Sequence, residues 1–127
     1  MTTRPTHFEV LADNVERVEK FYKNTFGWKF TTMPGPNPYW TISTGDANTK
    51  GIDGGLMPAK AVPGWPRGAF ICTLNTNTLD ADLKKVTANG GSIVAPKRAV
   101  PTMGWVAYCK DTEGNVFGVW QDDKNAK

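Results

Sequence analysis

The chain has 127 residues, of which 39% are hydrophobic and 21% charged, a length and composition typical of one compact globular domain. Its only histidine is His7, which excludes sites that need several imidazoles from one chain, such as multi-histidine zinc sites. Its 15 basic and 12 acidic residues give a net charge of +3. They are spread along the chain, so we expect no nucleic-acid partner, which would need clustered Lys and Arg.

The cysteines and the apolar segments indicate the compartment. Cys72 and Cys109 each lie in an apolar run with strand-like character, and no second pair accompanies them, so we expect both to be reduced core residues. The N-terminal residues carry no apolar stretch typical of a secretion signal, and no run approaches the ~18 apolar residues that a membrane span requires. We therefore expect a cytoplasmic protein with no membrane partner.

The first half of the chain predicts a strand, a helix and three further strands. A β-rich run over residues 6–12 precedes Asp13, a good helix N-cap with Glu16 in the capping-box position. Apolar residues then recur at helical spacing as far as Phe26, and Gly27 follows as a left-handed stop. The further strands are expected at residues 28–33, 39–44 and 51–57.

The second half repeats this order after an irregular connector rich in proline and glycine. A strand over residues 69–75 is followed by Asn77 or Thr78 as the cap of a second helix, which Gly90 and Gly91 end. Strands are then expected at residues 92–95, 105–110 and 115–121, with turns at 96–104 and 111–115. The two halves match in element order rather than in residue identity.

Two consecutive β-α-β-β-β units define the expected architecture. Each unit presents one open sheet face and covers the other with its helix. Two of them predict an α+β fold in which two βαβββ modules form an eight-stranded curved sheet around a cleft, with the helices outside. We expect a single domain over residues 1–127, with module one at residues 5–57, a connector at 58–68 and module two at 69–122.

Strand alternation places His7 and Glu9 on the open face of the first strand, while Phe8 and Val10 pack under the helix. Because they are two residues apart on one strand, their side chains project into the same cleft. A His–Glu pair can perform acid–base chemistry, such as taking a proton from a carbon next to a carbonyl. The alternative is structural, with His7 hydrogen-bonded at the cleft mouth and Glu9 paired with a Lys or Arg.

Residues of the other strands are candidates for ligand contact. On the third strand, either Trp40 with Ile42 or Tyr39 with Thr41 lines the sheet interior. On the fifth strand, Cys72 and its alternate neighbours, including Phe70, lie under the second helix. An aromatic cluster with a few polar groups is typical of a pocket for a planar or hydrophobic molecule, and core packing is the alternative for each ring. The candidate ligand-binding residues are Trp40, Ile71, Thr73, Trp105, Tyr108 and Trp120, with Trp105 and Tyr108 on opposite faces of their strand.

Several short motifs together indicate a known family. They are His7-Phe-Glu-Val, Asp13 with Arg17, Phe21-Tyr22, Phe26-Gly27-Trp28, Gly54-Gly55-Leu56, Gly90-Gly91, Gly104-Trp105-x-x-Tyr108 and Asp111-x-x-Gly114-Asn115-x-Phe117-Gly118. Over nearly its whole length the chain resembles the vicinal oxygen chelate superfamily, also called the glyoxalase, bleomycin-resistance and dioxygenase superfamily. The resemblance implies a small-molecule ligand and a homodimer. Because the superfamily includes lyases, isomerases, dioxygenases and metal-free drug-binding proteins, the fold does not choose the function.

Metal-using members of this superfamily place ligands on the first, fourth, fifth and eighth strands. The resemblance puts His7 at the first of these positions, but it puts Ile71 at the fifth-strand position and Gly118 at the eighth. Neither of those two residues offers a lone pair. The fourth-strand position falls in or next to residues 54–57, where Asp53 is the only nearby carboxylate. Since a divalent cation needs at least three protein ligands, we expect no cofactor, and His7 is the only residue that matches a ligand position.

Two hypotheses for the function follow. The first is a metal-free member of the superfamily that binds a small, partly aromatic molecule in the cleft. The second is a lyase, isomerase or dioxygenase-type enzyme. It would use either a weakly held divalent metal at His7 or the His7–Glu9 pair as an acid–base device. Metal content and ligand binding in the presence of a chelator distinguish the two hypotheses.

Overall fold

The computed structural model describes residues 3–127, so the first two residues of the N-terminal segment considered above lie outside the described part. The chain divides into two compact units. Residues 7–70 form the first, called here the N-terminal unit. Residues 71–127, together with residues 3–6, form the second, called the C-terminal unit. Among the described residues, the structure contains no helix that is long and apolar enough to cross a membrane.

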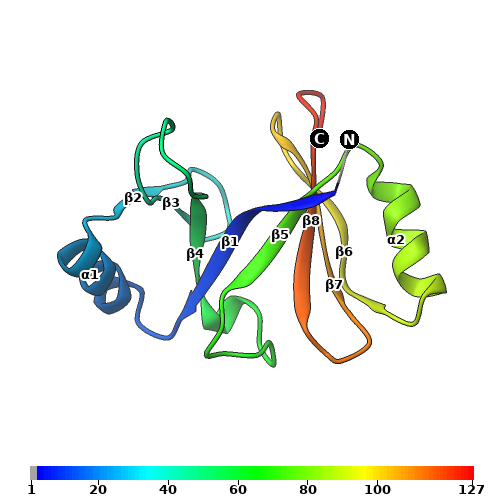
Figure 1. Ribbon diagram of the computed structural model, residues 1–127, viewed down its shortest axis with the longest axis horizontal. Helices are drawn as coiled ribbons and strands as arrows, with labels where there is room; N and C mark the ends of the chain where they lie inside the picture. Colours follow the sequence, from blue (N-terminus) through cyan, green and yellow to red (C-terminus); the bar gives the residue numbers. More distant parts are fainter. Residues whose placement is uncertain (1–2) are drawn as a thin grey trace. The chain divides into compact units, whose positions relative to one another are not determined.

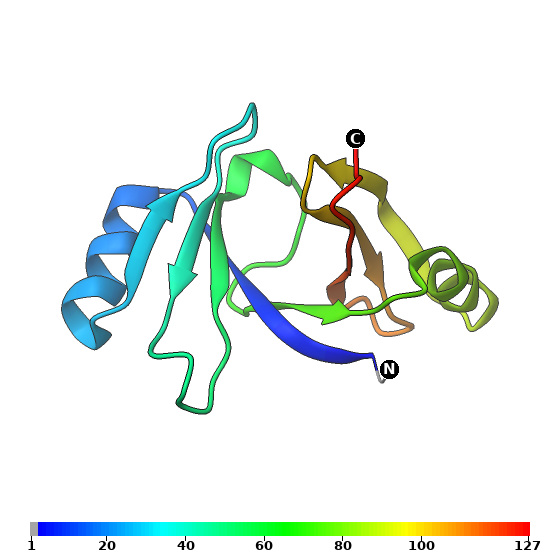
Figure 2. The ribbon, with the colours of Figure 1, turned by 90° about the horizontal axis from the view of Figure 1, so that it is seen from above.

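The N-terminal unit is a four-stranded sheet with one helix (Figure 1). Its strands lie in the order β2-β3-β4-β1, with β1 parallel to β4 and β3 antiparallel to both of its neighbours. In the view of Figure 2, α1 runs alongside these strands on one side. The elements are β1 (Arg4–Ala12), of which residues 7–12 belong to this unit, α1 (Val15–Phe26), β2 (Lys29–Thr32), β3 (Trp40–Ser43), β4 (Gly54–Pro58) and a short 3₁₀ turn (Ala59–Ala61).

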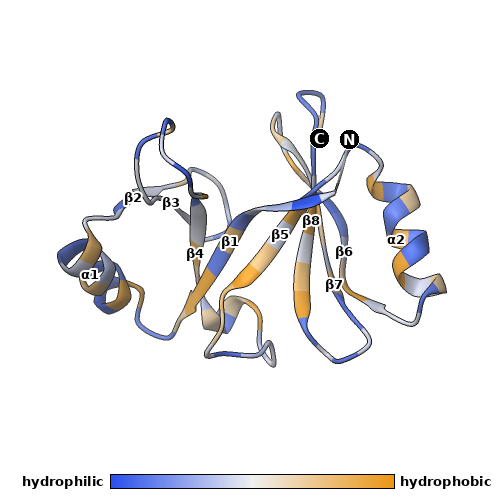
Figure 3. Ribbon diagram, viewed as in Figure 1, coloured by the Kyte–Doolittle hydropathy of each residue, from blue (hydrophilic) through white to orange (hydrophobic). Residues whose placement is uncertain are grey.

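The C-terminal unit repeats this plan, with the strand order β5-β8-β7-β6 and β5 parallel to β8. The elements are β5 (Ile71–Asn75), α2 (Leu79–Ala88), β6 (Ser92–Val100), β7 (Gly104–Lys110) and β8 (Val116–Asp122). In Figure 3, α2 alternates between hydrophobic and hydrophilic residues, as expected of a helix that covers a sheet with one side. The predicted α+β class, with its two successive β-α-β-β-β units, is confirmed.

Helix α1 begins one residue later than the sequence predicts. The side chain of Asn14 accepts a hydrogen bond from the backbone N–H of Arg17 at 2.9 Å, so Asn14 rather than Asp13 is the N-cap. Asp13 instead forms an ion pair with Arg67 at 2.6 Å. The end of the helix is as predicted: Gly27 has a φ of 75° and its N–H donates to the carbonyl of Lys23.

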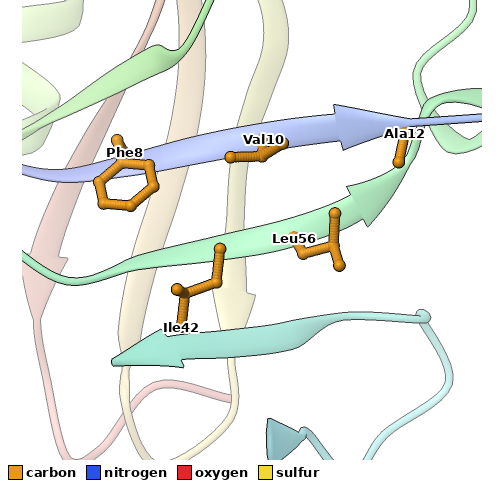
Figure 4. Packing of buried hydrophobic residues seen from close by; sticks show 5 residues of the cluster. All are labelled: Phe8, Val10, Ala12, Ile42 and Leu56. Carbon is orange, nitrogen blue, oxygen red and sulfur yellow. The ribbon is translucent and has the colours of Figure 1, made fainter. Parts of the chain in front are cut away.

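The core of the N-terminal unit lies on the face of its sheet that α1 covers. Figure 4 shows the buried side chains of three neighbouring strands pointing to this same side. They are Phe8, Val10 and Ala12 of β1, Ile42 of β3 and Leu56 of β4. Trp40 packs against this cluster too, since it pairs with Leu56 across the strands. The third strand therefore has the phase in which Trp40 and Ile42 face the helix, and the placement of Trp40 in the cleft is corrected.

Two residues expected under the second helix lie elsewhere. Phe70 precedes β5 and stacks on Phe8 of the N-terminal unit, with 5.1 Å between ring centroids. Cys72 is exposed rather than buried, because α2 packs mainly against β6 and β8 and leaves this side of β5 uncovered. Cys109, by contrast, is buried in the core, as predicted.

Strand β6 continues through residues expected to form a turn. The predicted turn at residues 96–104 is shortened because β6 runs on to Val100. Its register with β7 shifts between Ile93 and Ala95 and again between Ala95 and Arg98. These irregularities, together with the position of β6 at the end of the strand order, accommodate Pro96, which has no N–H to donate to a regular ladder.

The N-terminus of α2 is capped from a distant strand. Thr78 occupies the N-cap position without a capping hydrogen bond from its side chain. Instead, the side-chain oxygen Oε1 of Gln121 in β8 accepts a hydrogen bond from the backbone N–H of Leu79 at 2.8 Å. Gln121 thus ties the helix to the sheet and satisfies one of the amides that a helix start leaves open.

Replacing Gln121 with alanine is expected to lower the free energy of unfolding by about 1 kcal/mol, because the Leu79 amide loses its acceptor, as in the loss of a helix cap. Denaturant unfolding followed by circular dichroism measures this change. Gln121→Glu is the matched variant. It keeps an acceptor oxygen and places a negative charge at a helix start, so it should retain most of the stability. Equal losses in both variants would show that the hydrogen bond is not the cause.

Candidate functional site

Glu9 lies on the face of the N-terminal sheet opposite the helix-covered core. Parallel pairing of β1 with β4 sets Glu9 across from Gly55, and Thr41 of β3 pairs with the same glycine. Neighbours in register point to the same side of a sheet, so Glu9, Gly55 and Thr41 share this face, called here the Glu9 face. Glu9 is only 2% exposed, which is unusual for a carboxylate in a small protein.

Two further polar groups accompany the Glu9 carboxylate. His7 Nε2 lies 3.9 Å from Glu9 Oε2 and 2.9 Å from the hydroxyl oxygen Oη of Tyr39. The His7 side chain is 34% exposed, so it is accessible while Glu9 is buried. The sequence prediction that His7 and Glu9 project to the same side is therefore met by the geometry, and Tyr39 joins them.

Tyr39 reaches this place because residue 55 is glycine. A Cβ atom built on Gly55 would lie 1.7 Å from Oη of Tyr39 and 2.1 Å from its Cζ. The end of the tyrosine ring thus occupies the volume that any larger residue at position 55 would need. The sequence offered Tyr39 only as one of two phases of the third strand. A glycine directly across from a buried carboxylate is the signal that favours it.

The environment keeps the Tyr39 hydroxyl protonated. Burial raises the pKa of Tyr39 far above its usual range, and the Glu9 carboxylate raises this pKa further, through its negative charge and by accepting a hydrogen bond from the hydroxyl. Tyr39 therefore keeps the proton that it donates to Glu9 well above the pH at which an ordinary tyrosine ionises.

The raised pKa of Tyr39 predicts how the stability of the protein changes at alkaline pH. Below about pH 10, the ordinary pKa of tyrosine, both folded and unfolded chains keep Tyr39 neutral. Above that pH only the unfolded chain loses the proton, so the stability that the raised pKa of Tyr39 represents is lost as pH rises. Phenolate absorbance should show Tyr39 titrating only as the protein unfolds. The absorbance that appears on unfolding should therefore be smaller by one tyrosine in Tyr39→Phe than in the wild type, and an equal rise in both proteins would refute the assignment.

The C-terminal unit carries a second glycine at the equivalent place. Gly118 of β8 pairs with Thr73 of β5 and Tyr108 of β7. A Cβ atom on Gly118 would lie 2.8 Å from Thr73 Oγ1 and 3.0 Å from the Tyr108 ring. Thr73 Oγ1 is buried and has no hydrogen-bond partner among the described residues. In both units a tyrosine thus covers the glycine of the last strand.

The candidate ligand-binding residues separate between two faces of the C-terminal sheet. Register and alternation place four of them on the face opposite α2: Ile71, Thr73, Tyr108 and Trp120. Trp105 lies on the other face, where it packs against the core beneath α2. Its indole N–H donates to Asp123 at 2.9 Å, and Lys97 Nζ lies 4.6 Å from its ring centroid. Trp105 and Tyr108 are on opposite faces as predicted, and Trp105, like Trp40, is corrected to a helix-covered core.

The residues at the ligand positions implied by the family resemblance do not fit a divalent cation. Ile71 is a buried aliphatic residue, and Thr73 and Tyr108 fill the space that a side chain at Gly118 would need. Asp53 Oδ1 accepts a hydrogen bond from the backbone N–H of Thr44 at 2.9 Å. Over residues 3–127, no group of three or more His, Cys, Asp and Glu side chains is arranged to hold a metal ion.

The comparison with protein families and the comparison with curated relatives agree on one family. The model of the Glyoxalase/Bleomycin resistance protein/Dioxygenase superfamily matches residues 4–119. A glyoxylase-like domain-containing protein from Didymella fabae is 30% identical over 116 residues, which cover 87% of this chain and 88% of that protein. A putative glyoxylase, CFP32, from Mycobacterium bovis is 24% identical over 95% of this chain. The match covers 46% of CFP32, so the chain spans about half the length of that relative.

Solved structures show the same fold. A methylmalonyl-CoA epimerase in complex with methylmalonyl-CoA and NH4+ superposes with a TM-score of 0.72 at 15% identity, covering 100% of this chain and 99% of that chain. A glyoxalase/bleomycin resistance protein/dioxygenase superfamily member from Vibrio splendidus 12B01 gives a TM-score of 0.64 at 13% identity. That match covers 95% of this chain and 100% of the other. At these identities the likeness concerns the fold alone.

Proposed function

We propose, since the chain belongs to the Glyoxalase/Bleomycin resistance protein/Dioxygenase superfamily, that it binds a small organic molecule through polar groups rather than through a metal ion. The observation that carries this proposal is the hydroxyl of Tyr39, which fills the space over Gly55 and contacts His7 at 2.9 Å. A side chain that reached a metal from position 55 would collide with this ring. The same place instead holds a hydrogen-bonding group suited to an organic ligand.

Burial and accessibility on the Glu9 face support this proposal. A buried carboxylate is costly unless other groups compensate its charge, and Glu9 accepts a hydrogen bond from Tyr39. His7 is the accessible neighbour, so we assign it the direct contact with the ligand. For the C-terminal unit, taken by itself, we propose Ile71, Thr73, Tyr108 and Trp120 as ligand contacts, because they share one face of that unit's sheet and this face carries no helix.

Ligand binding is tested by tryptophan fluorescence. The probes are a panel of small aromatic acids, aromatic amines and acyl thioesters, each titrated into the protein with and without EDTA. We expect saturable quenching by at least one class, with the same Kd in both conditions. The absence of saturable binding across the panel, or its loss in EDTA, would overturn the proposal.

A second candidate function is metal-free acid–base catalysis, and the approach of His7 Nε2 to within 3.9 Å of Glu9 Oε2 favours it. In this function His7 or Glu9 takes a proton from a carbon next to a carbonyl group in the bound molecule. Exchange of such protons for deuterium, followed by NMR of each compound that binds, tests it. Exchange that is abolished in both His7→Asn and Glu9→Gln would support catalysis, and no exchange in any bound compound would leave binding as the function.

The oligomeric state, the cellular location and the single-domain organisation are also proposals. We propose a homodimer, as the superfamily resemblance implies, located in the cytoplasm. The exposed aromatic residues of α1, Phe21 at 55% and Phe26 at 63%, are consistent with a surface that a second copy covers. Residues 1–127 are proposed to unfold as a single domain. Sedimentation equilibrium tests the dimer, and a single coincident thermal transition by two probes tests the single domain.

A further inference from the structure

The position of Tyr39 between His7 and Glu9 determines which way the hydrogen bonds run. The Tyr39 hydroxyl lies 2.9 Å from His7 Nε2 and is also hydrogen-bonded to the Glu9 carboxylate. A phenol has one proton to donate, whereas an ionised carboxylate can only accept. If Tyr39 donates its proton to Glu9, its contact with His7 requires that His7 donate.

The direction of the hydrogen bond between His7 and Tyr39 sets the tautomer of the His7 ring. For His7 to donate to Tyr39, its proton must be on Nε2, and in the neutral ring Nδ1 is then an acceptor with a free lone pair. The side chain is 34% exposed, so ligands can reach the ring. The order of groups is thus His7 Nε2–H to Tyr39 Oη, and Tyr39 O–H to Glu9.

Gly55 leaves the space in which Tyr39 can accept a hydrogen bond from His7 and donate one to Glu9. Parallel pairing of β1 with β4 sets Gly55 across from Glu9, and a Cβ atom at position 55 would lie 1.7 Å from Tyr39 Oη. Even alanine there would force the tyrosine ring away from the carboxylate. The hydrogen-bonded order therefore depends on the absence of a side chain on β4.

We infer that Tyr39 is a positioning residue that holds His7 in the Nε2–H tautomer and so leaves Nδ1 as the base that meets the ligand. The inference rests on the proposed function for its ligand, which would carry an acidic N–H or O–H group, or a C–H next to a carbonyl. When that bond breaks, its electrons stay on the ligand and the proton forms a new N–H bond at Nδ1. The resulting imidazolium keeps its Nε2–H bond to Tyr39, and the nearby Glu9 carboxylate balances its charge.

The single histidine makes this inference directly measurable, because ¹⁵N-labelled imidazole gives one pair of ring nitrogen signals. At a pH where the ring is neutral, we expect Nδ1 to appear unprotonated and Nε2 protonated, with an Nε2–H proton protected from exchange with water. In Tyr39→Phe and Gly55→Ala the tautomers should mix and the protected proton should disappear. Tyr22→Phe and Gly45→Ala are the matched controls, since Tyr22 packs on the helix-covered face and a Cβ at Gly45 meets only Thr49 at 3.6 Å.

An Nδ1–H tautomer in the wild-type protein, or a protected Nε2–H that persists in Tyr39→Phe, would overturn the inference. Tyr39→Phe removes one oxygen atom, so it keeps the test valid if Gly55→Ala fails to fold. The measurement uses ligand-free protein. A correct tautomer with no ligand binding would therefore count against the proposed function alone, whereas a wrong tautomer with intact binding would count against the role of Tyr39 alone. For any compound that binds, Tyr39→Phe should raise Kd about tenfold.

Discussion

Replacing Gly55 with alanine is expected to lower the free energy of unfolding by about 1–3 kcal/mol, the usual cost of an atom with no space in a packed structure. The new Cβ would lie 1.7 Å from Tyr39 Oη and 2.1 Å from its Cζ, so the whole ring must move. The displaced tyrosine would leave the buried Glu9 carboxylate without its hydroxyl donor. Denaturant unfolding measures the stability, and the fluorescence titration measures the accompanying loss of ligand binding.

A matched glycine substitution and a double variant separate the causes. Gly45→Ala adds the same methyl group where the nearest atom would be Thr49 Oγ1 at 3.6 Å, so its stability should match the wild type within about 0.5 kcal/mol. Combining Gly55→Ala with Tyr39→Ala should cost less than the sum of the two, because the colliding ring is gone. Additive costs, or a Gly55→Ala protein as stable as the wild type, would contradict the placement of Tyr39.

Replacing Glu9 with glutamine is expected to weaken ligand binding about 10- to 100-fold, the range for a hydrogen bond or ion pair that involves a charged group. The substitution keeps the size and shape of the side chain and removes the charge that His7 and Tyr39 face. Isothermal titration calorimetry with the compound that binds the wild type best measures the change.

The control for this substitution is Glu113→Gln, which removes the same charge from an exposed turn of the C-terminal unit and should leave Kd unchanged. Circular dichroism of Glu9→Gln should match the wild type, because glutamine can still accept a hydrogen bond from Tyr39. If Glu9→Gln binds as tightly as the wild type, the Glu9 carboxylate takes no part in the site.

Local sequence signals predict those parts of the fold that depend on neighbours along the chain. Gly27 ends α1 because only a residue that tolerates a left-handed backbone suits a φ of 75° there. Strand alternation correctly set His7 and Glu9 on one side of β1, since the period of two follows from the covalent chain itself. The repeated β-α-β-β-β order follows from the same kind of signal.

Sequence patterns do not predict features that depend on contacts between residues far apart in the chain. Alternation allowed two phases for the third strand, and only its pairing with β4 sets Trp40 beside Leu56 and toward the helix. Tyr39 became a site residue through the empty space above Gly55, which no local pattern shows. The apolar run around Cys72 predicts a core residue. Cys72 is nevertheless exposed, because burial on β5 depends on where α2 lies over the sheet.

Binding without a metal ion is tested most directly by elemental analysis of the protein purified without chelator, alongside His7→Ala. We predict far less than one equivalent of Zn, Ni, Fe or Mn in both proteins, together with a wild-type Kd for the ligand that EDTA does not change. One equivalent of any of these metals in the wild type, lost in His7→Ala, would contradict the proposal and assign the protein to the metal-dependent members of its superfamily.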